Sequence, residues 1–260
     1  MGILNVTPDS FSDGGRFVSA AAALRQARRM YAEGAAIIDV GGESTRPGAA
    51  LVSVTQELDR VLPVIEAIRA ELPVLISIDT SKPEVMRAAI AAGADMVNDI
   101  LALRAEGAIP VVREAGVSAC LMHMQGEPKT MQLAPAYGDV VREVRDFLVE
   151  RVEACEAQGV ARDRLVIDPG FGFGKTLEHN LCLLSELGKL VALGLPVLVG
   201  VSRKSMLGAL LGKPVGERLY GSLALAVWAG LNGAAILRVH DVGPTVEALK
   251  VVAAVKHRTE

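Results

Sequence analysis

The chain has few aromatic residues, few cysteines and little net charge, and each scarcity excludes a class of protein. Aromatic residues make up 3% of its 260 residues while Ala, Val and Leu abound, which favours buried parallel strands over an antiparallel sandwich. Cys120, Cys155 and Cys182 are too few and too scattered for a disulfide framework or a zinc site, so we expect reduced cysteines and a cytoplasmic protein. The net charge of −3 argues against nucleic acid or an anionic membrane as a partner.

Long apolar runs are also missing. No run reaches the roughly 18–20 residues of a membrane-spanning helix, and the start of the chain lacks the plan of a signal peptide. We therefore expect no membrane segment. The length is close to the roughly 250 residues typical of one α/β barrel, which is enough to bury a large single core.

Eight short apolar runs recur at roughly even spacing, and polar residues cluster where each run ends. The predicted strands are 2–6, 36–40, 74–78, 95–98, 118–122, 165–167, 197–201 and 235–239. The predicted helices are 19–33, 55–71, one opening at Ser81 with Glu84 in a capping box, 139–157, 178–193, 222–231 and one after Pro244. Repeated strand–helix units predict an α/β fold, a single-domain (β/α)8 TIM barrel over residues 1–260.

The first two βα loops are unusually long. Residues 7–15 and 41–48 are each about eight residues or more and rich in Gly, Pro, Ser, Thr and Asp, whereas such loops usually have roughly 2–6 residues. Their polarity and their place at the catalytic rim predict lids that fold over a ligand. Ordinary surface loops are the alternative.

Asp79, Asn98 and Asp168 follow strands 3, 4 and 6. Loop or helix capping is the alternative for each, but the predicted capping box at Ser81 and Glu84 leaves Asp79 without that duty. Together the three suit a planar heterocycle with several N–H groups, because a carboxylate accepts two parallel hydrogen bonds and Asn both donates and accepts.

Cationic residues follow strands 7 and 8, where barrels commonly bind phosphate. Arg203 and Lys204 come after strand 7, and Arg238 and His240 end strand 8, two residues apart and so on one side. Such residues are often only solvated surface groups, but a cluster in an acidic protein predicts a phosphate or diphosphate site.

Asn5, Asp9 and Asp13 offer hard oxygen ligands for Mg²⁺ bridging substrate phosphates, with Asx turns as the alternative. The run Gly170–Thr176 only imitates a phosphate-binding P-loop, because its first glycine position is Pro169. Lys175 and Thr176 are predicted to start a helix instead, with Thr176 as the cap. Neither His123 nor His179 has a second histidine or cysteine at a spacing useful for a metal.

Five motifs spread from Met1 to the last helix resemble the signatures of the dihydropteroate synthase family of folate biosynthesis. They are Met1–Gly15, Gly42–Gly48, Asp168–Phe173, Ser202–Ser205 and Arg238–Val242. Members usually carry residues before the first barrel strand, whereas this sequence opens directly on it. The resemblance implies a pterin-binding transferase that joins 6-hydroxymethyl-7,8-dihydropterin diphosphate to 4-aminobenzoate, with Mg²⁺ as cofactor, sulfonamides as competitors and a homodimer as the assembly.

The resemblance also assigns roles to individual residues. It places the pterin on Asp79, Asn98, Ile100, Met122, Asp168 and Lys204. It places the diphosphate on Asn5, Thr45, Arg238 and His240, with Asn5 meeting the metal. It places the aminobenzoate on Phe11, Arg46, Pro47, Phe173 and Ser205. The catalytic residues it implies are Asp13, Asp79, Asp168 and Lys204.

Three other functions remain open from the sequence. A pterin-binding methyltransferase would share Asp79, Asn98 and Asp168 but act on a methyl-folate, and the long first two loops argue against it. A Schiff-base aldolase would use Lys204 as its nucleophile. A pterin-binding module would bind without catalysing a reaction.

Overall fold

The structure is a computed structural model that describes residues 1–7, 16–44, 52–128 and 130–256. Its strands in that part of the chain are β1 (Gly2–Asn5), β2 (Ile37–Gly41), β3 (Leu75–Asp79), β4 (Met96–Asp99), β5 (Ser118–Met122), β6 (Leu165–Asp168), β7 (Leu198–Val199) and β8 (Ile236–Leu237). The α-helices are α1 (Arg16–Ala32), α2 (Val54–Glu71), α3 (Pro83–Ala91), α4 (Ala108–Ala115), α5 (Val140–Ala157), α6 (Leu177–Ser185), α7 (Leu187–Val191), α8 (Ser205–Leu211), α9 (Leu219–Leu231) and α10 (Val242–Lys256).

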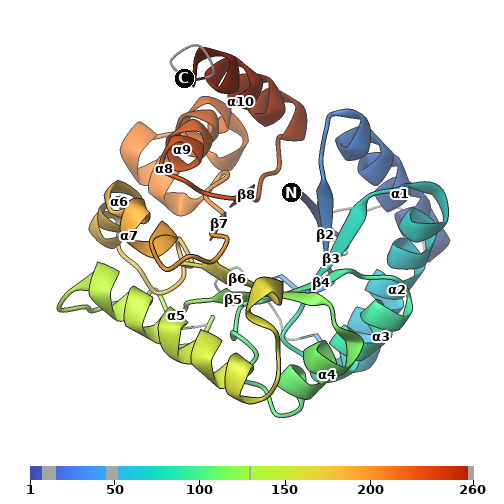
Figure 1. The fold of residues 1–260 in the computed structure, drawn as a ribbon. Coiled ribbons are helices and arrows are strands. Elements are labelled where there is room, and N and C mark those ends of the chain that lie inside the picture. The colour runs from blue at the N-terminus through green and yellow to red at the C-terminus, as the bar shows by residue number, and fades with distance from the viewer. Residues whose placement is uncertain (8–15, 45–51, 129, 257–260) are drawn as a thin grey trace.

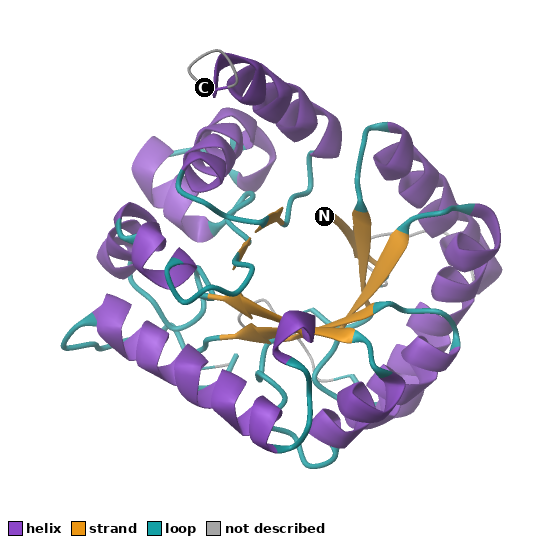
Figure 2. Cartoon of the chain, viewed as in Figure 1, coloured by secondary structure: helices purple, strands orange, loops and turns teal. Residues whose placement is uncertain are grey.

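The strands form a closed ring. β1 to β6 pair in parallel in chain order, and β7 pairs in parallel with β8. Isolated bridges from Ile167 to Val197 and from Gly2 to Val239 join the two sheets at both ends. The helices lie outside the ring of strands (Figures 1 and 2). The prediction of a (β/α)8 barrel is confirmed.

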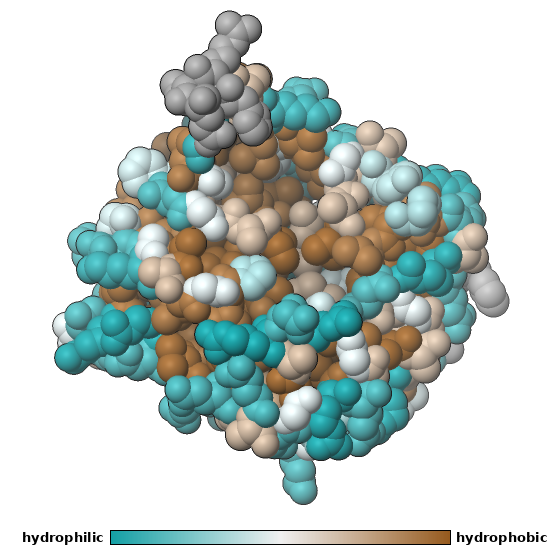
Figure 3. Space-filling model, in the orientation of Figure 1, coloured by the Kyte–Doolittle hydropathy of each residue, from teal (hydrophilic) through white to brown (hydrophobic). Residues whose placement is uncertain are grey.

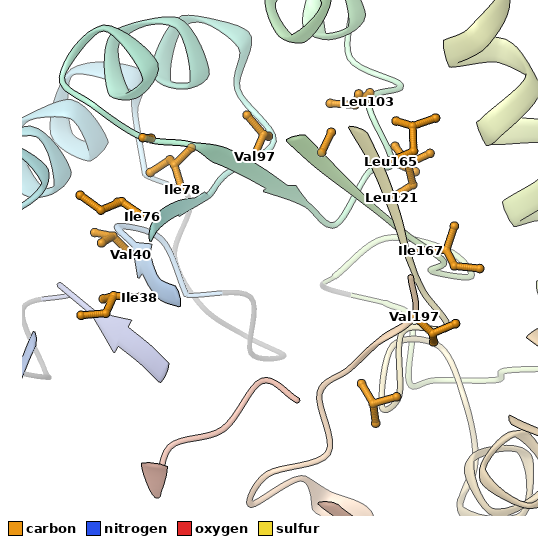
Figure 4. Close-up of a cluster of buried hydrophobic side chains, with 14 of the residues drawn as sticks. Ile38, Val40, Ile76, Ile78, Val97, Leu103, Leu121, Leu165, Ile167 and Val197 are labelled. Atoms are coloured by element: carbon orange, nitrogen blue, oxygen red, sulfur yellow. The ribbon is translucent and has the colours of Figure 1, made fainter. Parts of the chain in front are cut away.

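Alternation along the strands explains the main core. Ile38 and Val40 of β2 and Ile76 and Ile78 of β3 are fully buried and project toward the surrounding helices (Figure 4). Successive strand residues point to opposite faces. Asp39, between Ile38 and Val40, must therefore point into the barrel.

The inward positions fall into two layers. Met96, Cys120, Val166 and Leu198 form a buried apolar cluster in the barrel. Two residues further along β4, β5 and β6 come Asn98, Met122 and Asp168. The period of two places these side chains on the same inward face, so the barrel has an apolar middle and a polar carboxyl rim.

The face toward the viewer in Figure 3 is apolar around its centre. A hollow of about 330 Å³ is lined there by residues that begin β1, β2 and β8, including Met1, Ala36 and Ile236. These are the amino-terminal strand ends. The polar residues described below lie at the opposite rim.

The predicted cap of the third helix is wrong. α3 begins at Pro83, and its N-cap is Lys82, whose side chain makes no capping hydrogen bond. Proline at the first helical position restricts the residue before it to extended geometry, and it has no N–H to be capped. The box of Ser81 and Glu84 therefore does not form.

Other elements also differ from the prediction. The predicted helix 178–193 is divided at Glu186 (φ −105°, ψ 19°), which turns α7 so that Leu187 and Leu190 are fully buried. The short helices α4 and α8 were not predicted. β8 ends at Leu237, so Arg238 and His240 follow the strand rather than end it.

Candidate active site

A cluster of charged side chains joins β2, β3, β4 and the segment after β8 at the carboxyl rim. Arg238 donates from Nε to Asp39 Oδ2 and from Nη2 to Asp79 Oδ2, both at 2.6 Å. Asn98 donates from Nδ2 to Asp39 Oδ2 at 3.2 Å. One guanidinium thus holds two carboxylates 159 and 199 residues away in sequence.

Burial controls the charges in this cluster. Asp39 is 0% exposed, and its Oδ1 has no hydrogen-bond partner among the residues that the structure describes. Burial raises the pKa of Asp79 to about 7, against the opposing effect of Arg238. The pKa of Arg238 is raised because the attraction of Asp39 and Asp79 outweighs its burial. The guanidinium therefore stays charged while the carboxylates keep acceptor capacity for a ligand.

Asp168 and Lys204 complete the polar rim. Asp168 Oδ1 accepts a hydrogen bond from the Gly170 N–H at 2.7 Å, and burial raises its pKa. Burial and the nearby Arg238 lower the pKa of Lys204 to about 8, while Asp168 and Asp79 oppose the shift. Lys204 therefore interacts electrostatically with Asp168, Asp79 and Arg238, and we call this group of side chains at the carboxyl rim the cup.

An apolar wall lies beside these charges. Met122, Met124, Met131 and Phe173 form a buried cluster against which Ile100 packs. The Nζ atom of Lys204 lies 4.2 Å from the centroid of the Phe173 ring, a cation–π contact. The cup thus combines an apolar surface for a flat ring with hydrogen-bonding groups at its edge.

The space near Asn5 depends on a glycine. Asn5, Gly41 and Asp79 occupy successive positions across β1, β2 and β3. A Cβ atom at Gly41 would lie 3.5 Å from Asp79 Cβ and 3.7 Å from Asn5 Oδ1. Glycine therefore leaves room between the Asn5 amide and the Asp79 carboxylate, where a larger side chain would stand.

Known proteins are similar to this chain over nearly its whole length. A family model described as "Pterin binding enzyme" matches residues 1–240. The dihydropteroate synthase of Escherichia coli strain K12 is 57% identical over 98% of this chain and 90% of its own. The chain belongs to the dihydropteroate synthase family.

Solved structures of the family have the same fold. A Yersinia pestis dihydropteroate synthase in complex with a sulfonamide drug superposes with a TM-score of 0.94 at 52% identity, covering 99% of this chain and 94% of that one. The Xanthomonas albilineans enzyme in complex with 7,8-dihydropteroate has a TM-score of 0.90 at 50% identity, covering 98% and 92%.

The structure brings together most of the predicted residues that it describes. Asp79, Asn98, Asp168, Lys204 and Arg238 share the cup, with the wall residues Ile100, Met122 and Phe173. His240, two residues after Arg238, has its Nδ1 3.1 Å from Ser202 Oγ, and Ser205 is exposed at the first residue of α8. The predicted Phe11, Asp13, Thr45, Arg46 and Pro47, and Asp9, lie outside the described residues.

The sequence did not single out Asp39, and it did not predict the partner of Arg203. A charged residue inside the apolar run Ile37–Gly41 was the signal that could have identified Asp39. Arg203, expected among the phosphate-binding cations, donates from Nε to Asp241 Oδ2 at 3.0 Å. That ion pair joins the loop after β7 to the start of α10.

Acidic side chains also fix the start of the second long loop. Lys82 binds both Glu43, which follows β2, and Glu57 of α2, whose side chain is 0% exposed. The Oε1 atom of Glu43 accepts the Val52 N–H at 3.1 Å. Glu43 thereby links the Val52 backbone to the Lys82 ammonium group.

Two kinds of feature are absent from the described residues. No helix within residues 1–7, 16–44, 52–128 and 130–256 has the length and apolar composition needed to cross a bilayer. In the same residues, no three His, Cys, Asp or Glu side chains lie close enough together to hold a metal ion.

Proposed function

We propose that this chain joins 6-hydroxymethyl-7,8-dihydropterin diphosphate to 4-aminobenzoate, giving 7,8-dihydropteroate and diphosphate. The observation that carries the proposal is the shared cup, in which Asp79, Asp168 and Asn98 line one polar rim with Lys204 and Arg238. The complex of a 50% identical relative with 7,8-dihydropteroate supports the same chemistry. Competition by sulfonamides is proposed from the drug complex of the Yersinia pestis relative.

The carboxylates are suited to the pterin ring. Asp79, Asn98 and Asp168 supply acceptors and a donor for the N–H groups and nitrogens at the ring edge, and Met122 and Ile100 supply its apolar wall. Phe173 would then meet the aminobenzoate beside Lys204. Ser205, exposed near the rim, is the other described residue proposed for that substrate.

The proposed reaction is a dissociative displacement. The bond between the pterin methylene carbon and the diphosphate oxygen breaks, and the electron pair leaves with the oxygen. Ionised Asp79 and Asp168 stabilise the positive charge that spreads into the pterin. The aromatic amine then attacks the methylene carbon and loses a proton, so no covalent bond to the protein forms. Lys204, Arg238 and His240 are the cations proposed to receive the departing diphosphate.

Magnesium fits this site only as a companion of the diphosphate. The described residues offer the amide oxygen of Asn5 but no cluster that could hold a metal alone. Mg²⁺ commonly uses one or two protein oxygens and completes its shell with phosphate oxygens and water. When bound there, the ion would supply charge neutralisation at the leaving group.

Removing divalent metal should therefore abolish turnover without unfolding the protein. We expect chelation by EDTA to lower the rate of dihydropteroate formation at least tenfold and added Mg²⁺ to restore it. Isothermal titration of the protein with Mg²⁺ alone should show no tight binding. The same titration in the presence of the pterin diphosphate should show tight binding of Mg²⁺. Tight binding of Mg²⁺ to the protein alone would contradict the proposed site.

The activity should fall on the acid side of neutrality. Asp79 carries its negative charge, and accepts hydrogen bonds at both oxygens without donating one, only when it is ionised. Burial raises its pKa to about 7. As the pH falls through this value, Asp79 gains a proton and kcat/KM for the pterin diphosphate should decrease. The profile should be measured for the wild type and for Asp79→Asn, which should be slow at every pH and lack this decrease. A wild-type profile that stays flat below neutrality would contradict the assignment.

The direct test of the proposed function is a coupled assay of diphosphate release. Release should need both substrates and match the dihydropteroate formed. Methyl transfer from a methyl-folate would favour the methyltransferase, and a borohydride-trapped adduct on Lys204 would favour the aldolase. Pterin binding without diphosphate release would favour a pterin-binding module that catalyses no reaction.

We also propose a homodimer formed through the last helices. Tyr220, Trp228, Leu231 and Val251 on α9 and α10 are between 46% and 78% exposed, which is apolar surface that a second copy would cover. Sedimentation equilibrium should give twice the chain mass, and Trp228→Lys should shift it toward the monomer. A wild-type monomer at assay concentration would refute this assembly.

A further inference from the structure

The side chain of Lys175 is almost fully buried beneath the loop that carries part of the site. It is 3% exposed and follows the segment 169–174 after β6. Its Nζ lies 3.0 Å from the carbonyl oxygens of Gly170 and Phe173 and 2.9 Å from His123 Nδ1. A fourth acceptor, the His123 carbonyl, lies at 3.4 Å.

Burial lowers the pKa of Lys175 to about 7, and the charge of Asp168 opposes that shift. The chemistry of its partners matches the protonated form. An ammonium has three N–H donors, and the three short contacts are three acceptors. Burial and the nearby Lys175 lower the pKa of His123 to about 3, so its imidazole is neutral and accepts at Nδ1. A neutral amine would have only two donors and would leave a buried acceptor unpaired, which is costly.

Gly170 and Phe173, whose carbonyls bind Lys175, also contact side chains of the cup. Phe173 N–H donates to the Gly170 carbonyl at 3.0 Å, so the ammonium binds both ends of one turn. The N–H of Gly170 holds the Asp168 carboxylate, and the ring of Phe173 lies against Lys204. The turn also fits tightly, since a Cβ atom at Gly170 (φ +68°) would lie 1.9 Å from the His123 carbonyl oxygen.

We propose that Lys175 is a positioning residue, whose buried ammonium holds the turn Gly170–Phe173 so that the Asp168 carboxylate and the Phe173 ring face the substrates correctly. It acts through these two residues and does not touch the substrates. The roles of Asp168 and Phe173 in this proposal rest on the proposed function. The placement of the Phe173 ring against Lys204 is observed in the structure and does not depend on the proposed function.

The test replaces the ammonium while keeping the length of the side chain. Lys175→Met leaves the Gly170 and Phe173 carbonyls without their donor, so the turn should shift. In steady-state assays below the unfolding transition, KM for 4-aminobenzoate should rise and kcat should fall, each at least tenfold. The control is Leu148→Ala, which leaves a cavity in the core next to α5. This variant should have a lower Tm but a KM within twofold of the wild-type value.

A second readout needs no activity. The Phe173 ring should shift the NMR signals of the Lys204 ε-methylene by its ring current, and ¹³C-labelled lysine makes that signal visible. Lys175→Met should move the signal toward that of an exposed lysine, whereas Leu148→Ala should not. If Lys175→Met does not fold, His123→Leu is the second variant, because it removes the Nδ1 acceptor of the Lys175 ammonium. It should change the kinetics and the Lys204 signal in the same directions but by less.

The outcomes separate the two proposals. A wild type that forms no dihydropteroate overturns the proposed function, and the Lys204 signal still decides whether Lys175 holds the turn. An active wild type whose Lys175→Met variant keeps KM, kcat and the Lys204 signal within twofold of normal overturns the positioning role. The same changes in KM, kcat and the Lys204 signal in Leu148→Ala would show a general effect of destabilisation. That result would also overturn the positioning role of Lys175.

Discussion

Asp168→Asn should reduce kcat by roughly 10²–10³-fold, the size expected when one preorganised electrostatic group is removed from a reaction that develops charge. Asparagine has nearly the same shape, and its Oδ1 can still accept the Gly170 N–H. It cannot supply the negative charge that stabilises the pterin cation. The measurement is kcat from diphosphate release, with Tm recorded in parallel to confirm that the fold persists.

The control for this prediction is Asp163→Asn. Asp163 lies in the exposed turn Arg162–Arg164, just before β6. Asp163→Asn removes the same charge as Asp168→Asn from a nearby position in the chain. Its kcat should equal that of the wild type. Equal turnover in Asp168→Asn and the wild type would remove Asp168 from the mechanism.

Arg238→Met should lower both stability and activity, because Arg238 is the counterion of two carboxylates. Asp39 and Asp79 would remain buried without it, and removing one partner of a buried ion pair typically costs roughly 3–5 kcal/mol of unfolding free energy. The measurement is chemical denaturation near pH 8, where Asp79 of the wild type is ionised according to its pKa of about 7.

Two comparisons test the cause of that loss. The double variant Asp39→Asn with Arg238→Met removes one of the unpaired charges and should recover part of the stability but none of the activity. Arg203→Met breaks a pair whose side chains are 35% and 19% exposed and should cost less than Arg238→Met. An unfolding free energy of Arg238→Met within about 1 kcal/mol of the wild type would show that the carboxylates do not need this counterion.

The repeating pattern of the chain was sufficient to predict the barrel. Apolar runs such as Leu165–Asp168 end in polar residues, and alternation sends those residues to one rim. Local signals also predicted the Thr176 cap of α6, which accepts from the His179 N–H. The cap at Ser81 failed because Pro83 imposes a different start on α3.

The partners of the charged residues could not be predicted in this way. The sequence interpretation divided the rim into acids for the ring and cations for the diphosphate. In the structure Arg238 lies between Asp39 and Asp79, so part of its charge serves the carboxylates. Lys175 likewise looked like the start of a helix, and only its burial under the loop shows that it holds the turn Gly170–Phe173.

The sequence alone determined the kind of fold, the rim that carries the chemistry and the family of the chain, because strand periodicity and long motifs are local properties of neighbouring residues. Tertiary structure decided which charges meet. Ion pairs such as Arg238 with Asp39 join residues 199 positions apart, and closure of the ring brings β8 beside β1 and thus near β2. The strength of those pairs depends on burial, which a residue acquires only when the whole barrel has formed around it.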